Sequence, residues 1–233
     1  WGYCMPTGKN IKGALEEVFK DAEERNGNLR IVMLTNGNRA MLETMFPDKF
    51  DYVRSPENQD YIYTSRDLAT LAGKRFHAKR NHISKFYRTY TDTRFETLSE
   101  SNIPDALTVA KLWCAENDTD PEASSEITAI REMCDLKDEY NVKGAVLYVD
   151  SKPVAMTLGS EISPKVYDIN FEKALREYDG VYAVINNEFA KTLTLYEYIN
   201  REEDMGLEGL KKSKLSYNPV IILDRWNAIP KKR

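Results

Sequence analysis

The stretch Lys143–Glu172, which reads KGAVLYVDSKPVAMTLGSEISPKVYDINFE, decides the fold class. It contains three runs rich in apolar and β-branched residues, at 143–150, 153–162 and 165–172, and only a short turn separates the first two. Runs of this length and composition predict strands, and short turns between them predict hairpins. We therefore expect an antiparallel sheet in the second half of the chain.

The sequence on either side alternates between helical and strand patterns. Hairpins followed by a strand-helix-strand-helix-strand order predict a protein of the α/β (α+β) class, with a mixed, mostly antiparallel sheet flanked by helices. The predicted helices span 10–24, 37–45 capped by Asn36, a short segment capped by Ser65, 73–88, 104–116, 122–140, 180–193 and 206–216, and the other predicted strands span 29–34, 50–54, 60–64, 94–99, 195–200 and 219–226.

The most loop-like stretch in the middle of the chain is DTDPEASSE, at 118–126. It predicts two α/β halves, 1–117 and 118–233, although no internal sequence repeat is strong enough to prove a duplication. Because the first residue is Trp1, and WGYCMP lacks the features of a signal peptide, the sequence leaves open that the first half is incomplete at its start.

Composition excludes several classes of protein. A chain of 233 residues with 42% hydrophobic residues can bury a large core, and a net charge of -4 excludes a uniformly basic nucleic-acid binder. Three cysteines without CxxC spacing predict a reducing compartment, with the cytoplasm as the default. The longest apolar runs, such as PVIIL at 219–223, are far shorter than the roughly 20 residues of a membrane-spanning helix.

The segment 74–88 is strongly basic, with six lysines and arginines and no acid. On a helix, Lys79 and Arg80 flank the buried edge while Lys85 faces outward. A basic helix is often simply solvated. The lack of an acid in this segment favours binding of phosphate, a tRNA backbone or an anionic lipid.

The segment 200–217, NREEDMGLEGLKKSKLSY, places a lysine on the apolar side of a predicted helix. Lys214 falls within the apolar stripe of that helix and Lys211 shares its side. A buried ammonium needs a partner, so Lys214 either forms an ion pair with Asp204 or Glu172 or has a functional role in a cavity.

The start of the same helix offers a second signal. Glu202, Glu203 and Asp204 can all be explained as caps that complement the helix dipole. Gly206 and Gly209 also leave the first turn without bulky side chains, so backbone donors there can approach an anion or an oxyanion.

Two further elements carry polar residues of interest. Alternation along 165–172 places Asp168, Asn170 and Glu172 on one strand face, which is either solvated or lines a cleft with Glu172 as the general base or an amine-binding carboxylate. On the helix 180–193, Asn186 falls within the apolar stripe, either as a structural link or as a substrate contact, whereas its neighbour Asn187 is expected to point to solvent.

The searches for metal ligands and nucleophiles find little. His77 and His82 are five residues apart and project to different sides of a helix, so they do not form a chelating pair. Neither histidine has a serine or cysteine triad context, which makes acyl-enzyme chemistry an unfavoured reading.

Four blocks together resemble a known bacterial family. They are YIYTSRDLATLAGKRFHAKRNHISKF (61–86), FEKA (171–174), GVYAVINNEFA (180–190) and NREEDMGLEGLKKSKLSYNP (200–219). In this order they are similar to the C-terminal domain of phosphatidylglycerol lysyltransferases, and the resemblance covers nearly the whole chain.

The resemblance implies two tandem domains of the GNAT acyltransferase type, related to Fem-type transferases that use aminoacyl-tRNA. For membrane-bound synthases of the family it implies aminoacyl transfer from tRNA to a lipid headgroup, whereas no membrane domain is expected within these 233 residues. It further implies cleft roles for the residues of the matching blocks, which are Glu203, Asp204, Lys211, Lys214, Lys79, Arg80, Asn81, Glu172, Lys173 and Asn186.

These observations lead to an acyltransferase as the first hypothesis. An activated ester or thioester, on charged tRNA or acyl-CoA, would be attacked directly by an acceptor amine or hydroxyl, and no tightly bound cofactor is expected. Lys79, Arg80 and Asn81 would hold the donor, together with Gly206, Gly209 and Lys211. Two alternatives stay open: a non-catalytic protein that binds an anionic metabolite, RNA or lipid headgroup, and peripheral association with the inner membrane face through the basic helix.

Overall fold

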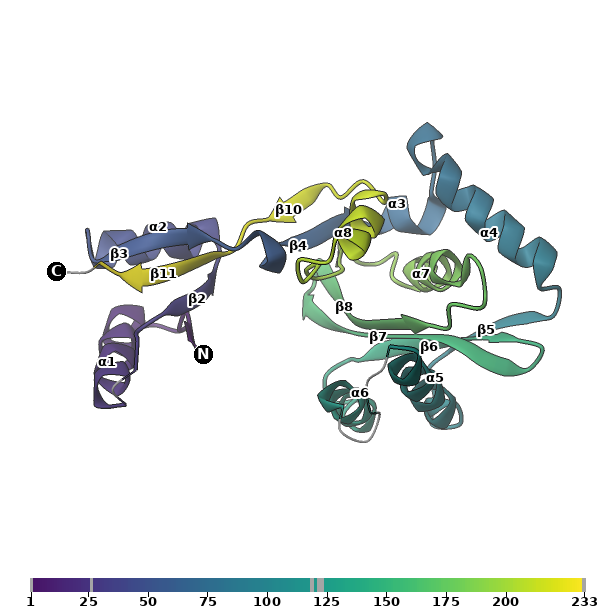
Figure 1. The fold of residues 1–233 in the computed structure, drawn as a ribbon, viewed down its shortest axis with the longest axis horizontal. Helices are drawn as coiled ribbons and strands as arrows, with labels where there is room; N and C mark the ends of the chain where they lie inside the picture. The colour runs from purple at the N-terminus through teal and green to yellow at the C-terminus, as the bar shows by residue number, and fades with distance from the viewer. Residues whose placement is uncertain (1, 26, 118–119, 121–123, 232–233) are drawn as a thin grey trace. The chain divides into compact units, whose positions relative to one another are not determined.

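A computed structural model describes residues 2–25, 27–117, 120 and 124–231 (Figure 1). The chain folds into two units, each built from segments that are distant in the sequence. One contains residues 1–61, 203–214 and 221–233, and the other contains residues 62–202 and 215–220.

The first unit is built on a four-stranded sheet with the order β1-β2-β11-β3. Its buried core consists of Leu15, Ile31, Leu34, Leu42, Phe50 and Ala228. The elements of this unit are β1 (Tyr3–Cys4), α1 (Ile11–Glu24), β2 (Ile31–Leu34), α2 (Asn36–Met45), β3 (Phe50–Arg54), η1 (Pro56–Asn58), α8 (Glu208–Leu215, whose last residue belongs to the other unit), β10 (Ile221–Leu223) and β11 (Trp226–Pro230).

The second unit is built on the strands β4-β9-β8-β7-β6-β5 of the larger sheet, in that order. Helices α5 and α6 lie on one face of this sheet and α7 lies on the other (Figure 1). The elements are β4 (Asp60–Thr64, which starts in the first unit), α3 (Ser65–Thr70), η2 (Lys74–Phe76), α4 (His77–Thr89), β5 (Thr93–Thr97), α5 (Ile103–Glu116), α6 (Ser125–Asp135), β6 (Lys143–Val149), β7 (Lys152–Ser163), β8 (Val166–Ala174), α7 (Val181–Thr192) and β9 (Tyr198–Asn200).

The segment Lys143–Glu172 forms the antiparallel strands β6 and β7 and most of β8, as predicted. The fold class is likewise confirmed, because open mixed sheets carry helices on their faces. Among the described residues, no helix has both the length and the apolar character needed to span a membrane.

Two helix caps differ from the predicted ones. Thr35, not Asn36, caps α2 with its side chain, and Thr64, not Ser65, caps α3. In both cases the hydroxyl of the preceding threonine accepts a hydrogen bond from a first-turn amide, which moves the helix start by one residue.

The predicted bounds of two further elements, one strand and one helix, also differ from the observed ones. The predicted strand 219–226 divides into β10 and β11, which belong to different sheets. The predicted helix 122–140 is shorter, since α6 ends at Asp135, and its first two residues lie outside the described part of the chain.

The two units do not follow the predicted boundary between residues 117 and 118. Each is a packing unit that the chain enters more than once, whereas the prediction concerned two sequential GNAT-like halves. The predicted boundary also adjoins residues 118 and 119, which lie outside the described ranges, so the tandem halves stay a prediction.

Candidate functional site

In the second unit, the parallel strands β8 and β9 pair over only three residues and then part. The pairs are Val166 with Tyr198, Tyr167 with Ile199, and Asp168 with Asn200. β9 ends at Asn200, whereas β8 continues to Ala174. Side chains that follow these pairs can therefore meet between the two chain segments.

An irregularity in the pairing of β7 with β8 determines which side chains of β8 can meet those that follow β9. Leu158 pairs with Phe171 and Gly159 pairs with Ile169, so that one residue of β8, Asn170, is extra. Such a bulge reverses the alternation beyond it. Glu172 consequently shares the face of Tyr167 and Ile169, not the face of Asp168 as the simple alternation predicted.

Glu172 forms a buried ion pair with the first residue after β9. Arg201 Nη2 lies 2.8 Å from Glu172 Oε1, and the two side chains are only 11% and 10% exposed. Asn186 of α7 donates from Nδ2 to the other carboxylate oxygen, Oε2, at 3.0 Å. Because both oxygens of Glu172 accept hydrogen bonds, the carboxylate is fixed in place between the strand and the helix.

Aromatic rings surround the Arg201 guanidinium. Its centre lies 4.9 Å from the ring centroid of Tyr217 and 5.8 Å from that of Tyr63. Burial opposes its charge, but the neighbouring Glu172 and the two tyrosines outweigh burial and raise the pKa of Arg201 above its ordinary value. Burial also raises the pKa of Tyr217 to about 12.

Lys79 of α4 reaches the same cluster. Its Nζ lies 3.9 Å from the ring centroid of Tyr217, and its side chain is half-buried. Burial and the positive charge of Arg201 lower the pKa of Lys79 to about 8, against the opposing effect of Glu172. The three charged groups Lys79, Arg201 and Glu172 carry a net positive charge in a partly desolvated setting.

Asn186 and its neighbour Asn187 are both buried, contrary to the prediction for Asn187. Asn187 donates to the carbonyls of Leu68 and Ala69 at 2.7 and 3.0 Å, so it satisfies the end of α3 instead of pointing to solvent. No described residue donates to Asn186 Oδ1, which is buried. Asn187 is therefore structural, and Asn186 belongs to the cluster around Glu172.

The structure thus brings together three of the predicted site residues, Glu172, Asn186 and Lys79. The sequence did not identify Arg201 as a site residue. It precedes the acidic residues Glu202–Asp204 and directly follows a strand, where no pattern of apolar residues distinguishes it. Lys173 is also buried but lies on the other sheet face, where it pairs with Glu126 at 2.7 Å and covers the ring of Trp113 at 3.6 Å.

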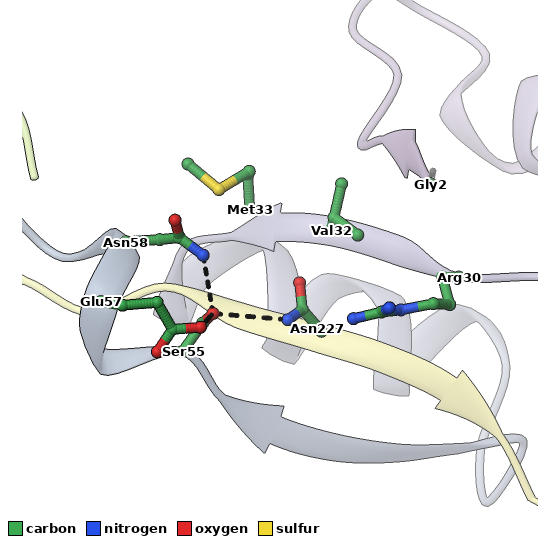
Figure 2. Close-up of a pocket in the computed structure, with 8 residues that line it drawn as sticks. All are labelled: Gly2, Arg30, Val32, Met33, Ser55, Glu57, Asn58 and Asn227. Atoms are coloured by element: carbon green, nitrogen blue, oxygen red, sulfur yellow. Dashed lines mark hydrogen bonds between the residues drawn. The ribbon is translucent and has the colours of Figure 1, made fainter. Parts of the chain in front are cut away.

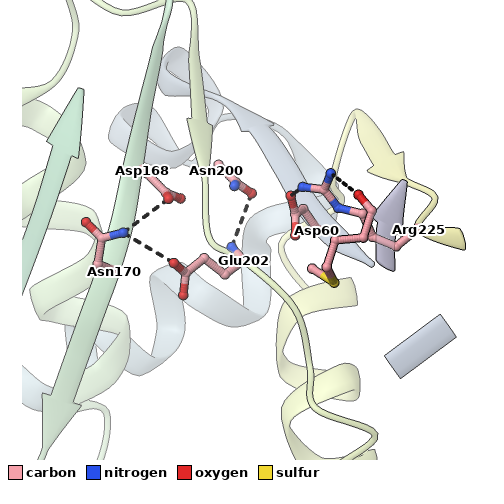
Figure 3. A network of polar contacts seen from close by, with 7 residues as sticks. Asp60, Asp168, Asn170, Asn200, Glu202 and Arg225 are labelled. Atoms are coloured by element: carbon pink, nitrogen blue, oxygen red, sulfur yellow. Dashed lines mark hydrogen bonds and ion pairs between the residues drawn. The ribbon is translucent and has the colours of Figure 1, made fainter. Parts of the chain in front are cut away.

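A second polar network lies where β8 and β9 are still paired. Asn170 donates to Asp168 at 3.1 Å and to Glu202 at 3.3 Å, and the Glu202 amide donates to the side chain of Asn200 at 3.1 Å (Figure 3). Glu202 has a left-handed backbone conformation, with φ at 53°. This network orders the chain around the turn beyond Arg201.

In the first unit, Asp204 organises the start of α8. It accepts a hydrogen bond from the Tyr61 hydroxyl at 2.5 Å and another from the Gly206 amide at 2.8 Å. Burial and Asp204 together raise the pKa of Tyr61 to about 12. Lys214 is also buried, with Nζ 5.9 Å from the Tyr61 ring centroid. The predicted burial of Lys214 is confirmed, and its catalytic role stays a prediction.

The remaining predicted residues near α8 are more exposed. Gly206 precedes the helix with φ at 73°, which favours glycine, and Gly209 and Lys211 face solvent within it. Elsewhere in this unit, Arg225 pairs with Asp60 at 2.5 Å (Figure 3). Whether Gly206, Gly209 and Lys211 contact a donor stays a prediction.

The basic helix is less uniformly positive than its sequence suggests, because other elements supply acids. Arg75 pairs with Asp67 at 2.7 Å and Lys85 with Asp179 at 2.6 Å. Arg80 donates to carbonyls at the end of α3, including that of Gly73 at 2.8 Å. Lys79, by contrast, lies near the buried charges of Arg201 and Glu172.

Asn81, the other predicted donor contact on α4, is exposed and lies 3.1 Å from the ring of His77. Its predicted role is untested. Within the described ranges, no three histidine, cysteine, aspartate or glutamate side chains gather as a metal site would require.

The first unit also carries an open hollow of about 350 Å³ (Figure 2). Ser55 lies at its base, donating to Glu57 at 2.6 Å and accepting from Asn58 at 2.7 Å. The other lining residues are Gly2, Arg30, Val32, Met33 and Asn227. Arg30 and Glu57 are exposed, so the hollow is well solvated.

Comparison with solved structures gives the fold. A conserved protein of unknown function from Bacteroides thetaiotaomicron is 38% identical, with a TM-score of 0.88 over 98% of this chain and 78% of that one. L-PGS from Bacillus licheniformis is 13% identical, with a TM-score of 0.71 over 99% of this chain and 77% of that one. A tandem GNAT protein from the clavulanic acid biosynthesis pathway is 10% identical, with a TM-score of 0.52, over 98% and 72% of the two chains.

The last two likenesses show a shared fold, which is of the GNAT type. The family model described as "Phosphatidylglycerol lysyltransferase, C-terminal" matches residues 2–229, which is nearly the whole chain. The blocks that suggested this family in the sequence lie within that range, including the one that contains Arg201. The chain therefore belongs to the family of phosphatidylglycerol lysyltransferase C-terminal domains.

Proposed function

We propose that the protein is an acyltransferase that moves an acyl group from an activated ester or thioester to an amine or hydroxyl acceptor. The family and the GNAT-like fold support acyl transfer in general. The structural observation that carries the proposal is the buried pair of Glu172 and Arg201 at the place where β8 and β9 part. A fixed, buried cation of this kind suits a reaction that develops negative charge.

The reaction requires no protein nucleophile. The acceptor attacks the carbonyl carbon of the donor, and the carbonyl oxygen becomes an oxyanion. Arg201 supplies positive charge in a partly desolvated cluster, where it stabilises an oxyanion more strongly than in water. Glu172 holds Arg201 in place through the ion pair, and Asn186 in turn holds the carboxylate of Glu172.

We further propose aminoacyl-tRNA as the first donor to test, with acyl-CoA as the second. The name of the family model refers to lysyl transfer, and that supports an aminoacyl donor. Arg80, Asn81 and Lys211 are then contacts for the donor's phosphates. Gly206 and Gly209 admit the donor close to the backbone, and Lys214, with Nζ 5.9 Å from the Tyr61 ring centroid, is proposed as an oxyanion contact.

The test uses purified protein, incubated separately with aminoacyl-tRNA and with acyl-CoA, each labelled in the acyl group. Candidate acceptors are an amine, a hydroxyl compound and phosphatidylglycerol vesicles. We expect the label to move to an acceptor with one donor, and Glu172→Gln to lower that rate strongly. Glu197→Gln is the matched control, because Glu197 forms an exposed surface pair with Lys165 at 3.2 Å.

Two outcomes would contradict the proposal. Donor that is retained on the protein without transfer would favour the binding-protein alternative. Binding to anionic but not neutral vesicles, lost at high salt and without any transfer, would favour peripheral association with a membrane surface.

A further inference from the structure

Lys79 differs in its surroundings from two other cations of the basic segment 74–88, Arg75 and Lys85. Lys85 is 61% exposed and pairs with Asp179, and Arg75 pairs with Asp67. Lys79 is half-buried over the ring of Tyr217, and none of the described carboxylates lies within 4.0 Å of its ammonium. A buried lysine without a carboxylate of its own is disfavoured in its charged form.

The groups that face Lys79 come from three parts of the second unit. Arg201 follows β9, Glu172 lies on β8, and Tyr217 follows α8. Glu172 accepts hydrogen bonds from Arg201 and Asn186. Burial lowers the pKa of Lys79 most, repulsion from Arg201 adds to this effect, and attraction to Glu172 offsets only part of it.

The position of Lys79 in its helix adds to this effect. α4 starts at His77, so Lys79 lies in the first turn, where the amide groups carry partial positive charge. That turn contains no acidic residue. The helix start, burial and Arg201 all favour the neutral amine over the ammonium.

We propose that Lys79 is the general base that removes the proton from the acceptor, an inference that rests on the acyl transfer proposed above. The lone pair of the neutral Nζ takes the proton of the acceptor N–H or O–H while the acceptor heteroatom forms its bond to the donor carbonyl carbon. The resulting tetrahedral species collapses, the bond to the donor oxygen or sulfur breaks, and the proton on Nζ passes to that leaving group. No electrons are gained or lost.

Two features of the cluster fit this role. Arg201 remains charged throughout the reaction and stays available for the oxyanion, because an arginine does not release its proton under these conditions. The lowered pKa of Lys79, about 8, places its neutral form within reach at neutral pH. A general base works best when its pKa lies near the working pH.

The first experiment measures the state of the amine without any turnover. The folded protein is labelled with a trace of acetic anhydride between about pH 6 and about pH 10, and each lysine is quantified by mass spectrometry. We expect the reactivity of Lys79 to reach half its maximum near pH 8 and that of Lys85 at a clearly higher pH. Parallel curves for Lys79 and Lys85 would overturn the inference.

The second experiment separates charge from proton transfer. Lys79→Arg keeps the positive charge but does not accept a proton, so we expect kcat to fall about 10²–10⁴-fold with little change in KM for the donor. The rate of the wild type should rise with pH through about 8, and the residual rate of Lys79→Arg should not. Lys85→Arg, on the same helix, should keep the wild-type profile.

The outcomes distinguish the two proposals. Turnover by wild type and Lys79→Arg at equal rates, with the same pH profile, would overturn the role of Lys79 and leave acyl transfer intact. Absence of turnover by the wild type with either donor would overturn acyl transfer itself, whatever the labelling shows.

Discussion

Arg201 Nη2 and Glu172 Oε1 lie 2.8 Å apart, although Arg201 follows the end of β9, where β8 and β9 no longer pair. The pair links the residue after β9 to the last part of the longer strand β8, and α7 contributes Asn186 to the same carboxylate. The pair is therefore a structural link as well as the proposed source of positive charge. Its two roles can be separated by measuring stability and activity on the same variants.

Removal of one partner of this pair should destabilise the fold. Glu172→Gln leaves Arg201 buried without its counter-ion, and we expect the free energy of unfolding to fall by about 3–5 kcal/mol. The double variant Glu172→Gln, Arg201→Gln should be less destabilised than the sum of the single variants, because no lone charge remains. Urea denaturation of the four proteins measures the coupling, and strict additivity would show that the pair contributes nothing.

The neighbouring asparagines should respond differently to substitution. Asn187→Ala removes the donor for two carbonyls at the end of α3, so we expect a loss of about 1–3 kcal/mol in stability. Transfer activity per folded molecule should stay near that of the wild type. Asn186→Ala should instead lower activity, since it releases one oxygen of Glu172. Denaturation curves and rates for both variants check this, and the reverse pattern would contradict it.

Lys214→Ala tests the predicted role of the buried lysine on α8. If Lys214 stabilises an oxyanion, its loss should lower kcat by about 10²–10³-fold while far-UV circular dichroism stays unchanged. Lys212→Ala is the matched control, because Lys212 is exposed on the same helix. Wild-type activity in Lys214→Ala would remove this residue from the site.

The lowered pKa of Lys79 also predicts how stability depends on pH. Between about pH 8 and the ordinary lysine value of 10.5, the unfolded chain binds a proton that the folded protein has released. Stability should therefore rise with pH across this window, by at most about 3 kcal/mol from this group. Lys79→Met removes the effect, so the difference in unfolding free energy between wild type and variant should move in favour of the wild type as pH rises. Urea denaturation at about pH 7, 8.5 and 10 measures this difference, and a constant value would contradict the prediction.

The sequence was sufficient to predict the fold class, because hairpin strands leave a local pattern of apolar runs separated by short turns. Three apolar runs with short turns in Lys143–Glu172 became β6, β7 and β8. The faces of β8 were not predictable in the same way. The extra residue Asn170 is visible only in the pairing with β7, and it moves Glu172 to the side of α7.

The candidate site was predictable only in part, for a related reason. Glu172, Asn186 and Lys79 could be identified as candidates because each is a polar residue within or next to a regular pattern of apolar residues. Arg201 follows a short strand, and its significance depends on a partner 29 residues earlier in the chain. Asn187 was predicted to point to solvent, because a helical pattern shows on which side of the helix a side chain lies. It does not show that α3 packs against that side.

The discontinuity of the first unit has a consequence for how the chain folds as it is synthesised. β11 lies between β2 and β3 in the four-stranded sheet, yet it is translated after every strand of the larger sheet. A nascent chain that has not reached Trp226–Pro230 therefore exposes facing edges of β2 and β3. The ribosome must translate the chain through Pro230 before this sheet can close, and until then β2 and β3 lack the strand that pairs with both.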